Sequence, residues 1–288
     1  NALYGLQFMS SEDAEVRQLL SVLTAKITSS SAVLEGQHIG NALYGLQCMS
    51  SKYVEVRDLL SALSTRIAES PAMLKAQEVG NALYGLRGMS GRDEDVCSVL
   101  ISLKSKCPAD VNEFLPAKGN GDTLQKNDEN ADLCRSVTLF RHFVTDVPSE
   151  VSSWLEEMEI VLSTYVSTCK PHDEEDTQSK IEKMFLTEIE AYARRRSIDI
   201  KVSGGVFLHG FVADVVVTCH DGRVVNIEVD GPKHMYPKAK AFDFARDKYL
   251  REVHGVSIFR VNLVNFDNIL TLEEVKKIVK TKISALIK

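Results

Sequence analysis

The N-terminal part of the chain repeats one pattern of apolar and polar positions every 40 residues. The segment Asn1-Ala-Leu-Tyr-Gly-Leu-Gln7 recurs at 41–47 and, with arginine as its last residue, at 81–87. Within each period the apolar residues are spaced by three and four positions and form two stripes, which predicts two amphipathic helices per repeat. A fixed period of this length is typical of stacked helical hairpins. We therefore expect an all-α helical-hairpin solenoid over residues 1–107.

Local signals place the two helices within each repeat. The first helix is preceded by Ser10 or Ser11, and serine is a favoured residue at helix N-caps. The second helix covers about 33–48 and contains Gly40 and Gly45. Glycine lowers helix propensity, so its return in each full copy predicts a close approach between neighbouring helices.

A polar stripe lies opposite the apolar stripe of the second helix. Its residues are Gln37, Asn41 and Tyr44 in one copy and Gln77, Asn81 and Tyr84 in the next. In helical-repeat RNA-binding proteins, amides bond to base edges or backbone and tyrosines stack on bases, so the stripe is a candidate RNA-binding surface. Alternatively, the stripe is a ladder between repeats, in which asparagine satisfies backbone groups and tyrosine fills the seam. Near-identity of the copies favours the ladder for asparagine, because a base-reading code should vary, and leaves both interpretations open for tyrosine.

The repeat pattern fades after Cys107. Residues 108–132 are rich in loop-forming residues and predict a flexible linker. Two apolar-periodic segments follow within 133–169 and are expected to form capping helices, since the last face of a solenoid has to be covered. Residues 170–176 contain consecutive acids that point in different directions, which favours a solvated acidic linker over a metal site.

From residue 177 the pattern changes to strands and helices of mixed order. Tight turns are predicted at Gly204-Gly205 and Asp221-Gly222. The predicted order is α-β-β-β-α-β-α, in one compact α+β domain over 177–288. The predicted elements are a helix at 178–196, strands at 197–202, 211–218 and 224–229, a helix at 238–253, a strand at 256–261 and a helix at 272–286.

Composition places the chain among ordinary globular proteins. Apolar residues make up 44% and charged residues 26% of the 288 positions, and no apolar run approaches the ~20 residues of a membrane span. The six cysteines are irregularly spaced without a CxxC pair, which favours reduced thiols in an intracellular protein over a disulfide framework or a zinc site. Because the chain starts at Asn1 inside a repeat, we expect an array truncated at its N-terminus and any targeting segment outside the sequence.

Charge is distributed unevenly along the chain. Residues 1–107 carry −1, residues 108–176 carry −10 and residues 177–288 carry +5, within a total of −6. A basic C-terminal domain favours polyanionic partners such as nucleic acid. Candidate phosphate contacts lie in and before the predicted helix at 238–253 and interleave with Phe242, Tyr249 and Leu250, although a solvated helix face is the alternative. The basic residues are Lys233, Lys238, Lys240, Arg246, Lys248 and Arg251, of which Lys233, Lys238, Arg246 and Arg251 are the leading candidates.

Three acids interrupt the apolar strands of this domain. Asp214 lies in the middle of one strand, and Glu228 and Asp230 flank Val229 at the end of the next. Carboxylates in such positions cost free energy unless they are paired, bound to a ligand or facing a cleft. Hairpin pairing brings Asp214 near Glu228, so these three acids are a candidate site for Mg²⁺ or Mn²⁺, which would activate water at a phosphodiester.

The C-terminal domain resembles the RAP domain, a family named for RNA binding and abundance in apicomplexans. The resemblance covers about 206–265 and rests on the string Val-Asn-Ile-Glu-Val-Asp-Gly-Pro-Lys-His at 225–234, on Arg246-Asp247-Lys-Tyr-Leu250, and on Gly255-Val-Ser-Ile-Phe-Arg-Val. It implies RNA binding after helical repeats, in mitochondrial or plastid RNA processing, stability or ribosomal RNA maturation. RAP domains are in turn similar to the PD-(D/E)xK nucleases, particularly the very-short-patch repair endonucleases, which implies a restriction-endonuclease-like sheet core.

This resemblance assigns roles to individual residues. Asp214 would be the core acid, Glu228 the second acid and Glu188 the acid of the helix, while Asp230 and His234 match the repair-nuclease branch. Asp230 stands where the main nuclease family has lysine, which orients water and offsets developing charge. This departure favours RNA binding without cleavage and without a cofactor. A metal-dependent endoribonuclease with Asp214, Glu228, Asp230 and His234 as catalytic residues is the first alternative, and a protein-interaction solenoid that binds partners through its repeats is the second.

Overall fold

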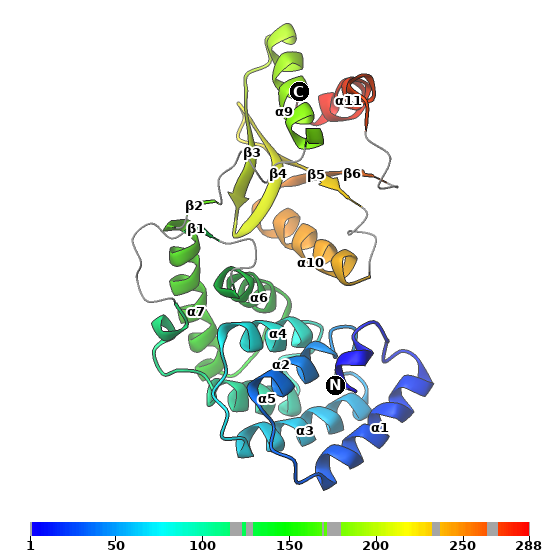
Figure 1. Cartoon of the computed structure of the whole chain (residues 1–288), viewed down its shortest axis with the longest axis vertical. Helices are drawn as coiled ribbons and strands as arrows, with labels where there is room; N and C mark the ends of the chain where they lie inside the picture. The colour runs from blue at the N-terminus through cyan, green and yellow to red at the C-terminus, as the bar shows by residue number, and fades with distance from the viewer. Residues whose placement is uncertain are drawn as a thin grey trace. The chain divides into compact units, whose positions relative to one another are not determined.

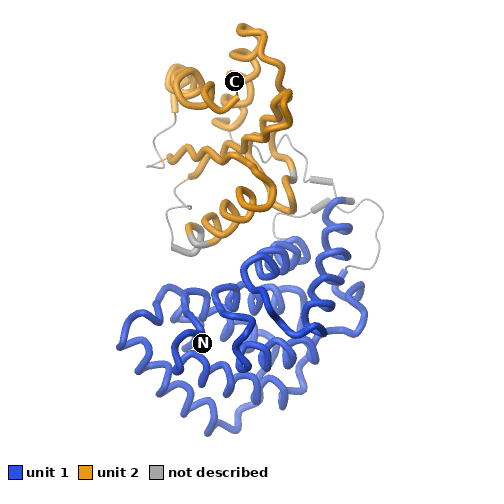
Figure 2. Tube along the Cα trace, turned by 180° about the vertical axis from the view of Figure 1, so that it is seen from behind, with its two compact units in different colours: residues 1–169 blue, residues 170–288 orange. Residues whose placement is uncertain are grey.

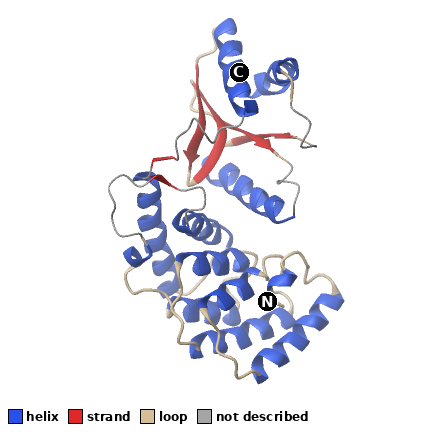
Figure 3. Cartoon of the chain, viewed as in Figure 1, coloured by secondary structure: helices blue, strands red, loops and turns tan. Residues whose placement is uncertain are grey.

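In the computed structural model, the repeat period of the sequence forms successive pairs of helices. The structure describes residues 2–115, 123–124, 129–168, 170–171, 180–231, 237–263 and 270–287. The chain divides into unit 1, residues 1–169, and unit 2, residues 170–288 (Figure 2). The part of unit 1 that the structure describes is almost wholly helical, whereas unit 2 combines helices with a small mixed sheet (Figure 3).

The helices of unit 1 alternate between the first and second positions of the repeat. First-position helices are α1, α3 and α5, and second-position helices are α2 and α4. The elements are the 3₁₀ turn η1 (Tyr4–Leu6), α1 (Ala14–Ser29), α2 (Gly36–Tyr44), α3 (Val54–Glu69), α4 (Ala76–Leu86), α5 (Glu94–Lys104), the 3₁₀ turn η2 (Val111–Phe114), the short β1 (Thr123–Leu124), α6 (Glu129–Phe143) and α7 (Ser149–Thr168).

Like helices stack on like helices in two layers (Figure 1). One layer places α1 on α3 and α3 on α5, and the other places α2 on α4 and α4 on α6. The first of the predicted capping helices therefore continues the second layer, and α7 packs against both α5 and α6. Because α6 begins at Glu129, its first turn and η2 lie inside the segment 108–132 that the sequence predicts to be a linker. Residues 116–122 and 125–128 of that segment lie outside the described residues.

Repeated glycines allow the second-position helices to approach one another. A Cβ added at Gly45 would lie 1.9 Å from the carbonyl oxygen of Leu3, and one added at Gly85 would lie 2.0 Å from that of Leu43. These separations are far below van der Waals contact, so only a residue without a Cβ fits. The close approach that the sequence predicts is confirmed at Gly45 and also at Gly40, where an added Cβ would lie 2.9 Å from the Cα of Glu78.

The predicted serine caps are wrong for the first helix. Its N-cap is Asp13, and no side chain caps it by hydrogen bonding. Ser11 is instead buried, and its hydroxyl oxygen accepts a hydrogen bond from the backbone N–H of Ser50 at 2.9 Å. Ser51 accepts the equivalent bond from Ser90 at 2.9 Å. This serine position therefore connects neighbouring repeats and does not begin a helix.

From residue 180 on, the described elements of unit 2 follow the predicted order of one helix, three strands, one helix, one strand and one helix, which is confirmed. We call α11, the π-helical turn η4 and α12 together the C-terminal helix. The elements are β2 (Lys170–Pro171), α9 (Lys180–Arg196), β3 (Ile200–Leu208), β4 (Phe211–Cys219), β5 (Val224–Asp230), α10 (Pro237–His254), β6 (Ser257–Asn262), α11 (Leu272–Ile278), η4 (Val279–Ile283) and α12 (Ser284–Leu286).

The four longer strands form one mixed sheet in the order β3-β4-β5-β6. The β3–β4 and β4–β5 pairs are antiparallel, and β5–β6 is parallel. The helices α9 and α11 cover one face of the sheet and α10 covers the other (Figure 1). The main apolar core lies under α9 and the C-terminal helix, with Phe185, Ile189, Val215 and Ile227 fully buried in it.

The first hairpin of the sheet turns later than the sequence predicts. Gly204 and Gly205 lie within β3, where Gly205 has a φ of 60°, and the turn falls at His209 and Gly210 with φ values of 50° and 86°. The His209 ring stacks on that of His254 with centroids 3.4 Å apart, which connects the hairpin tip to the end of α10.

Candidate nucleic-acid interface

The side of α10 that faces the sheet carries charged residues where an apolar stripe is the usual pattern. Asp243, Arg246 and Asp247 are all at most 8% exposed. They lie against the sheet, where Asn226, Glu228 and Asp230 share one face of β5 because side chains alternate along a strand. Arg260 of β6 joins them. We call the set Asn226, Glu228, Asp230, Arg246, Asp247 and Arg260 the α10–sheet network.

Arg246 neutralises Glu228 in the centre of this network. Its Nη2 donates to Glu228 Oε2 at 2.8 Å, and Asn226 Nδ2 donates to Glu228 Oε1 at 2.7 Å. The side chains of Glu228 and Arg246 are 4% and 7% exposed. Both oxygens of Glu228 are therefore occupied by protein donors, and Arg246 is not available to a phosphate. The prediction that Arg246 contacts RNA is wrong in this structure, because burial removes its side chain from the surface.

Arg260 holds the second acid of β5 and ties α10 to β6. Its Nη1 donates to Asp230 Oδ1 at 2.5 Å, while its Nε and Nη2 donate to the two oxygens of Asp247 at 2.8 and 2.9 Å. Burial lowers the pKa of the Arg260 guanidinium, but the hydrogen bonds to Asp247 and Asp230 outweigh this and raise it above its usual range. The bidentate geometry fixes the position of α10 on the sheet.

Asp214 lies near Glu228, as the sequence predicts, but in a different setting. Its Oδ2 accepts a hydrogen bond from the backbone N–H of Val229 at 2.7 Å. Burial, and then the negative charge of Glu228, raise the pKa of the Asp214 carboxyl to about 7, although the Val229 bond lowers it in part. The helix acid whose charge acts on Asp214 is Glu182. Glu188, the predicted helix acid, instead lies 3.8 Å from Arg195.

Replacing Asp214 by asparagine is expected to change how stability depends on pH. The folded state binds the Asp214 proton more tightly than the unfolded chain, so the free energy of unfolding of the wild type falls as pH rises from about 4 to about 7. The asparagine side chain would keep an oxygen for the Val229 N–H and would not ionise. Denaturation at pH 5 and pH 8 should therefore show the D214N variant gaining on the order of 2 kcal/mol relative to wild type at the higher pH. An equal difference between the two proteins at both pH values would contradict the raised pKa.

The carboxylates do not form an open metal site. In the part of the chain that the structure describes, no group of three or more His, Cys, Asp or Glu residues is placed to hold a metal ion. Glu228 and Asp230 direct oxygens at arginines. His234 and Lys233 lie outside the described residues, and so does the side chain of Lys238. The metal-dependent nuclease therefore stays a prediction, and the arginine pairing weighs against it.

The tyrosines of the repeat stripe are buried between repeats. The rings of Tyr4 and Tyr44 stack with centroids 5.8 Å apart, and those of Tyr44 and Tyr84 stack at 5.6 Å. Tyr44 and Tyr84 are each 5% exposed, so their rings cannot stack on bases in this conformation. The guanidinium of Arg87 covers the last ring at 3.7 Å from its centroid. For tyrosine, the structure corrects the RNA-binding prediction and supports the ladder.

The amides of the stripe are more accessible than its tyrosines. Gln37 and Gln77 are exposed, and Asn41 and Asn81 are half-buried. Their side chains follow one another on successive second-position helices, which stack directly. RNA binding by these four residues stays a prediction.

The opposite side of α10 is cationic and contains one exposed aromatic ring. Lys240, Phe244 and Lys248 follow at intervals of four residues, and Arg251 lies seven residues after Phe244, so the four share one face of the helix. Phe244 is 72% exposed, the highest exposure among the large apolar side chains that the structure describes. Lys240 and Arg251 are exposed and Lys248 is half-buried. We call these four residues the outer face of α10.

Sequence reasoning identifies the basic residues Lys240, Lys248 and Arg251 but misses Phe244. The aromatic residues that the sequence pattern singles out, Phe242 and Tyr249, face inwards, with ring centroids 6.2 and 5.9 Å from that of Phe211. The helical period would have identified the difference, because Phe244 is offset from the buried Ala245 and Leu250 on the helix. Alternation of basic and aromatic residues along the sequence does not distinguish the two sides of a helix.

The geometry defines a class of site, a cationic helix face with one exposed aromatic ring on a small α+β unit. No protein-family model matches the chain, and a comparison with curated proteins found no match. The resemblance to the RAP domain therefore stays a prediction. Within the described ranges, no helix has the length and apolar character needed to cross a membrane.

Proposed function

We propose that this chain is an RNA-binding protein and that the outer face of α10 binds single-stranded RNA. Phe244 stacks on a base, while Lys240, Lys248 and Arg251 contact the phosphates on either side. The observation that carries the proposal is the 72% exposure of Phe244 among three cations on one helix face. Aromatic stacking platforms beside cations are how proteins bind single strands without a fixed sequence.

Two further observations support this function. Residues 177–288 carry a net charge of +5, which favours a polyanion over a neutral or basic protein surface as the partner. The α10–sheet network holds α10 from behind through Arg246 and Arg260, so the outer face is a rigid platform that loses little conformational entropy on binding.

The wider assignment extends from this site to the whole chain. We propose that unit 1 is a helical-hairpin solenoid and unit 2 a RAP domain with a restriction-endonuclease-like sheet. The stacking of like helices and the element order of unit 2 support these assignments. The proposed setting is mitochondrial or plastid RNA processing, which rests on the RAP resemblance.

Replacing Phe244 by alanine is expected to weaken RNA binding by about 5- to 150-fold, since a stacked base contributes about 1–3 kcal/mol. Fluorescence anisotropy with a labelled single-stranded oligoribonucleotide measures the change. The matched control is Ile160→Ala, because Ile160 is 59% exposed on α7 and its removal also trims one exposed apolar side chain.

The two variants separate stacking from general surface effects. Full affinity in F244A, or an equal loss in I160A, would contradict the assignment of the outer face. Tryptophan in place of Phe244 provides a second test, because a larger ring should keep or raise the affinity. Phe244 is exposed and has little packing to lose, so a change in stability would not explain a loss of affinity in the alanine variant together with retained affinity in the tryptophan variant.

A further inference from the structure

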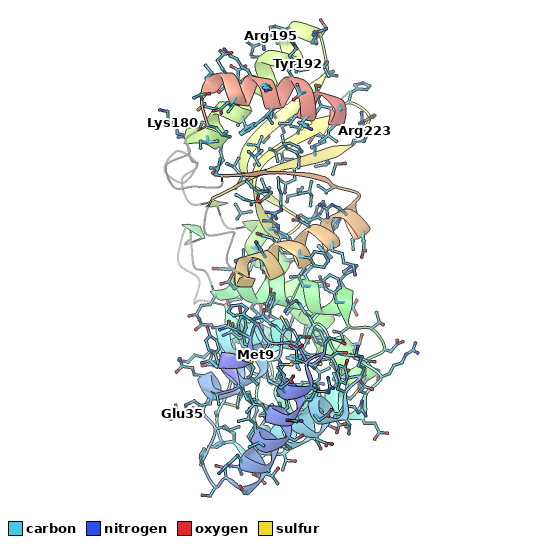
Figure 4. The ribbon with its side chains drawn as sticks, turned by 90° about the vertical axis from the view of Figure 1, so that its right-hand side faces the viewer. Met9, Glu35, Lys180, Tyr192, Arg195 and Arg223 are labelled. Carbon is cyan, nitrogen blue, oxygen red and sulfur yellow. The ribbon has the colours of Figure 1, made fainter. Side chains whose placement is uncertain are left out.

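The other helical layer of unit 2 has a separate concentration of positive charge. The last turn of α9 is Arg194-Arg195-Arg196, and all three residues are exposed. After its first turn the C-terminal helix contains four lysines and no acid, at Lys276, Lys277, Lys280 and Lys282. We call these seven residues the basic layer surface, and Figure 4 labels Arg195 near the end of α9.

Packing of α9 against the C-terminal helix brings Arg195 and Lys276 close to one another. In the apolar core, Phe185 and Ile189 of α9 pack with Val275 and Val279, and α9 contacts both α11 and η4. Glu188 lies near cations of both helices: Arg195 Nη2 lies 3.8 Å from its Oε2, and its charge raises the pKa of Lys276 after the larger effect of Glu273, whose Oε1 lies 2.8 Å from Lys276 Nζ. Arg195 in turn opposes the charge on Lys276. Arg195 and Lys276, from different helices, therefore lie near the same buried carboxylate. The seven cations outnumber the acids beside them, Glu188, Glu273 and Glu274.

Helix dipoles do not account for this excess. A helix C-terminus carries about −0.5 of an elementary charge, so two such ends offset about one of the seven positive charges. The acids of the C-terminal helix, Glu273 and Glu274, are confined to its first turn, where Glu274 forms a capping box with Thr271. Glu273 pairs with Lys276 at 2.8 Å, so the helix has its acids in the first turn only and three cations beyond that pair.

We propose that the basic layer surface binds the phosphodiester backbone of the same RNA that the outer face of α10 binds. This inference rests on the proposed function for the identity of the ligand. The two surfaces differ in chemistry: both have cations that suit phosphates, but only the outer face of α10 adds an aromatic ring for a base. The basic layer surface therefore contributes affinity and salt dependence without sequence preference.

The test variant replaces Arg194, Lys277 and Lys280 by glutamine. Arg195 and Lys276 stay unchanged, because they pair with Glu188 and Glu273 and the variant has to fold. The control replaces three exposed cations of unit 1, Lys26, Lys75 and Arg92, in the same way and changes net charge equally. Both are measured in the full chain by RNA binding across a salt series.

Each lost phosphate contact should reduce the slope of log affinity against log salt by about 0.7, so the test variant should lose about two units of slope. At about 0.1 M salt this corresponds to roughly 100-fold weaker binding, with the control close to wild type. An unchanged slope in the test variant, or an equal change in the control, would overturn the inference.

A second probe separates this inference from the proposed function. Inorganic polyphosphate has phosphates but no bases, so it should bind wild type in a salt-dependent way, bind F244A equally well, and bind the test variant more weakly. If RNA fails to bind while polyphosphate shows this pattern, the proposed function fails, RNA is not the ligand, and only the phosphate chemistry of the surface stands. If polyphosphate binds wild type and the test variant equally, the phosphate surface fails, whatever the effect of F244A on RNA. If the test variant binds polyphosphate more weakly than wild type but keeps the wild-type RNA slope, the surface binds a polyanion other than RNA. That result would overturn the inference in favour of an acidic protein segment.

Discussion

Replacing Arg246 by methionine is expected to lower the free energy of unfolding of unit 2 by about 3–5 kcal/mol. Methionine fills a similar volume but leaves the Glu228 carboxylate without its cationic partner at a side-chain exposure of 4%. Breaking a buried ion pair from one side costs far more than the pair contributes, because the remaining charge stays desolvated. Hydrogen exchange of peptides covering β5 measures the loss, since Trp154, the single tryptophan, belongs to unit 1 and does not report on this sheet.

Two companion variants distinguish the ion pair from general damage to α10. Arg251→Met changes an arginine on the same helix whose side chain is 53% exposed and 3.8 Å from Asp247, so it should cost less than about 0.5 kcal/mol. Adding Glu228→Gln to R246M should restore much of the lost stability, because a neutral amide tolerates the site better than an unpaired charge. If R246M were no more destabilised than R251M, the α10–sheet network would have no role in holding α10.

Replacing Gly85 by alanine is expected to destabilise unit 1 by about 3 kcal/mol or more. Its new Cβ would lie 2.0 Å from the carbonyl oxygen of Leu43, which is backbone and has no rotamer to adopt. The helices α2 and α4 would have to separate, and the stacked rings of Tyr44 and Tyr84 between them would lose contact. Overpacking of this kind typically costs about 1–3 kcal/mol, and a clash with backbone belongs at the upper end or beyond. Denaturant unfolding followed by Trp154 fluorescence measures it.

The repeat provides its own control at Gly5, which is the same position two periods earlier. An added Cβ at Gly5 meets nothing within 4 Å, so Gly5→Ala should be neutral or slightly stabilising. Comparable losses in the two variants would mean that glycine acts through local backbone freedom and not through the close approach of helices.

The candidate site was partly predictable from the sequence. Asp214 and Glu228 interact, as hairpin pairing around Asp221-Gly222 requires, because register follows from turn position and alternation. The partner of Glu228 was not predictable. Arg246 lies 18 positions away on another element, and whether it points at the sheet or at solvent depends on the rotation of α10 about its axis. For the same reason Phe244 and Phe242, two positions apart, have opposite environments.

The sequence by itself determined the period of unit 1, the order of elements in unit 2 and the need for glycine at Gly45, since each follows from local spacing of residue types. Only the tertiary structure decided which polar side chains are buried and paired with other residues of the protein. Tyr44 is enclosed by the neighbouring repeat, and Glu228 is neutralised by an arginine from α10. Desolvation is a property of the packed assembly: a side chain becomes buried only when distant segments cover it, and that coverage has no signature within a short stretch of sequence.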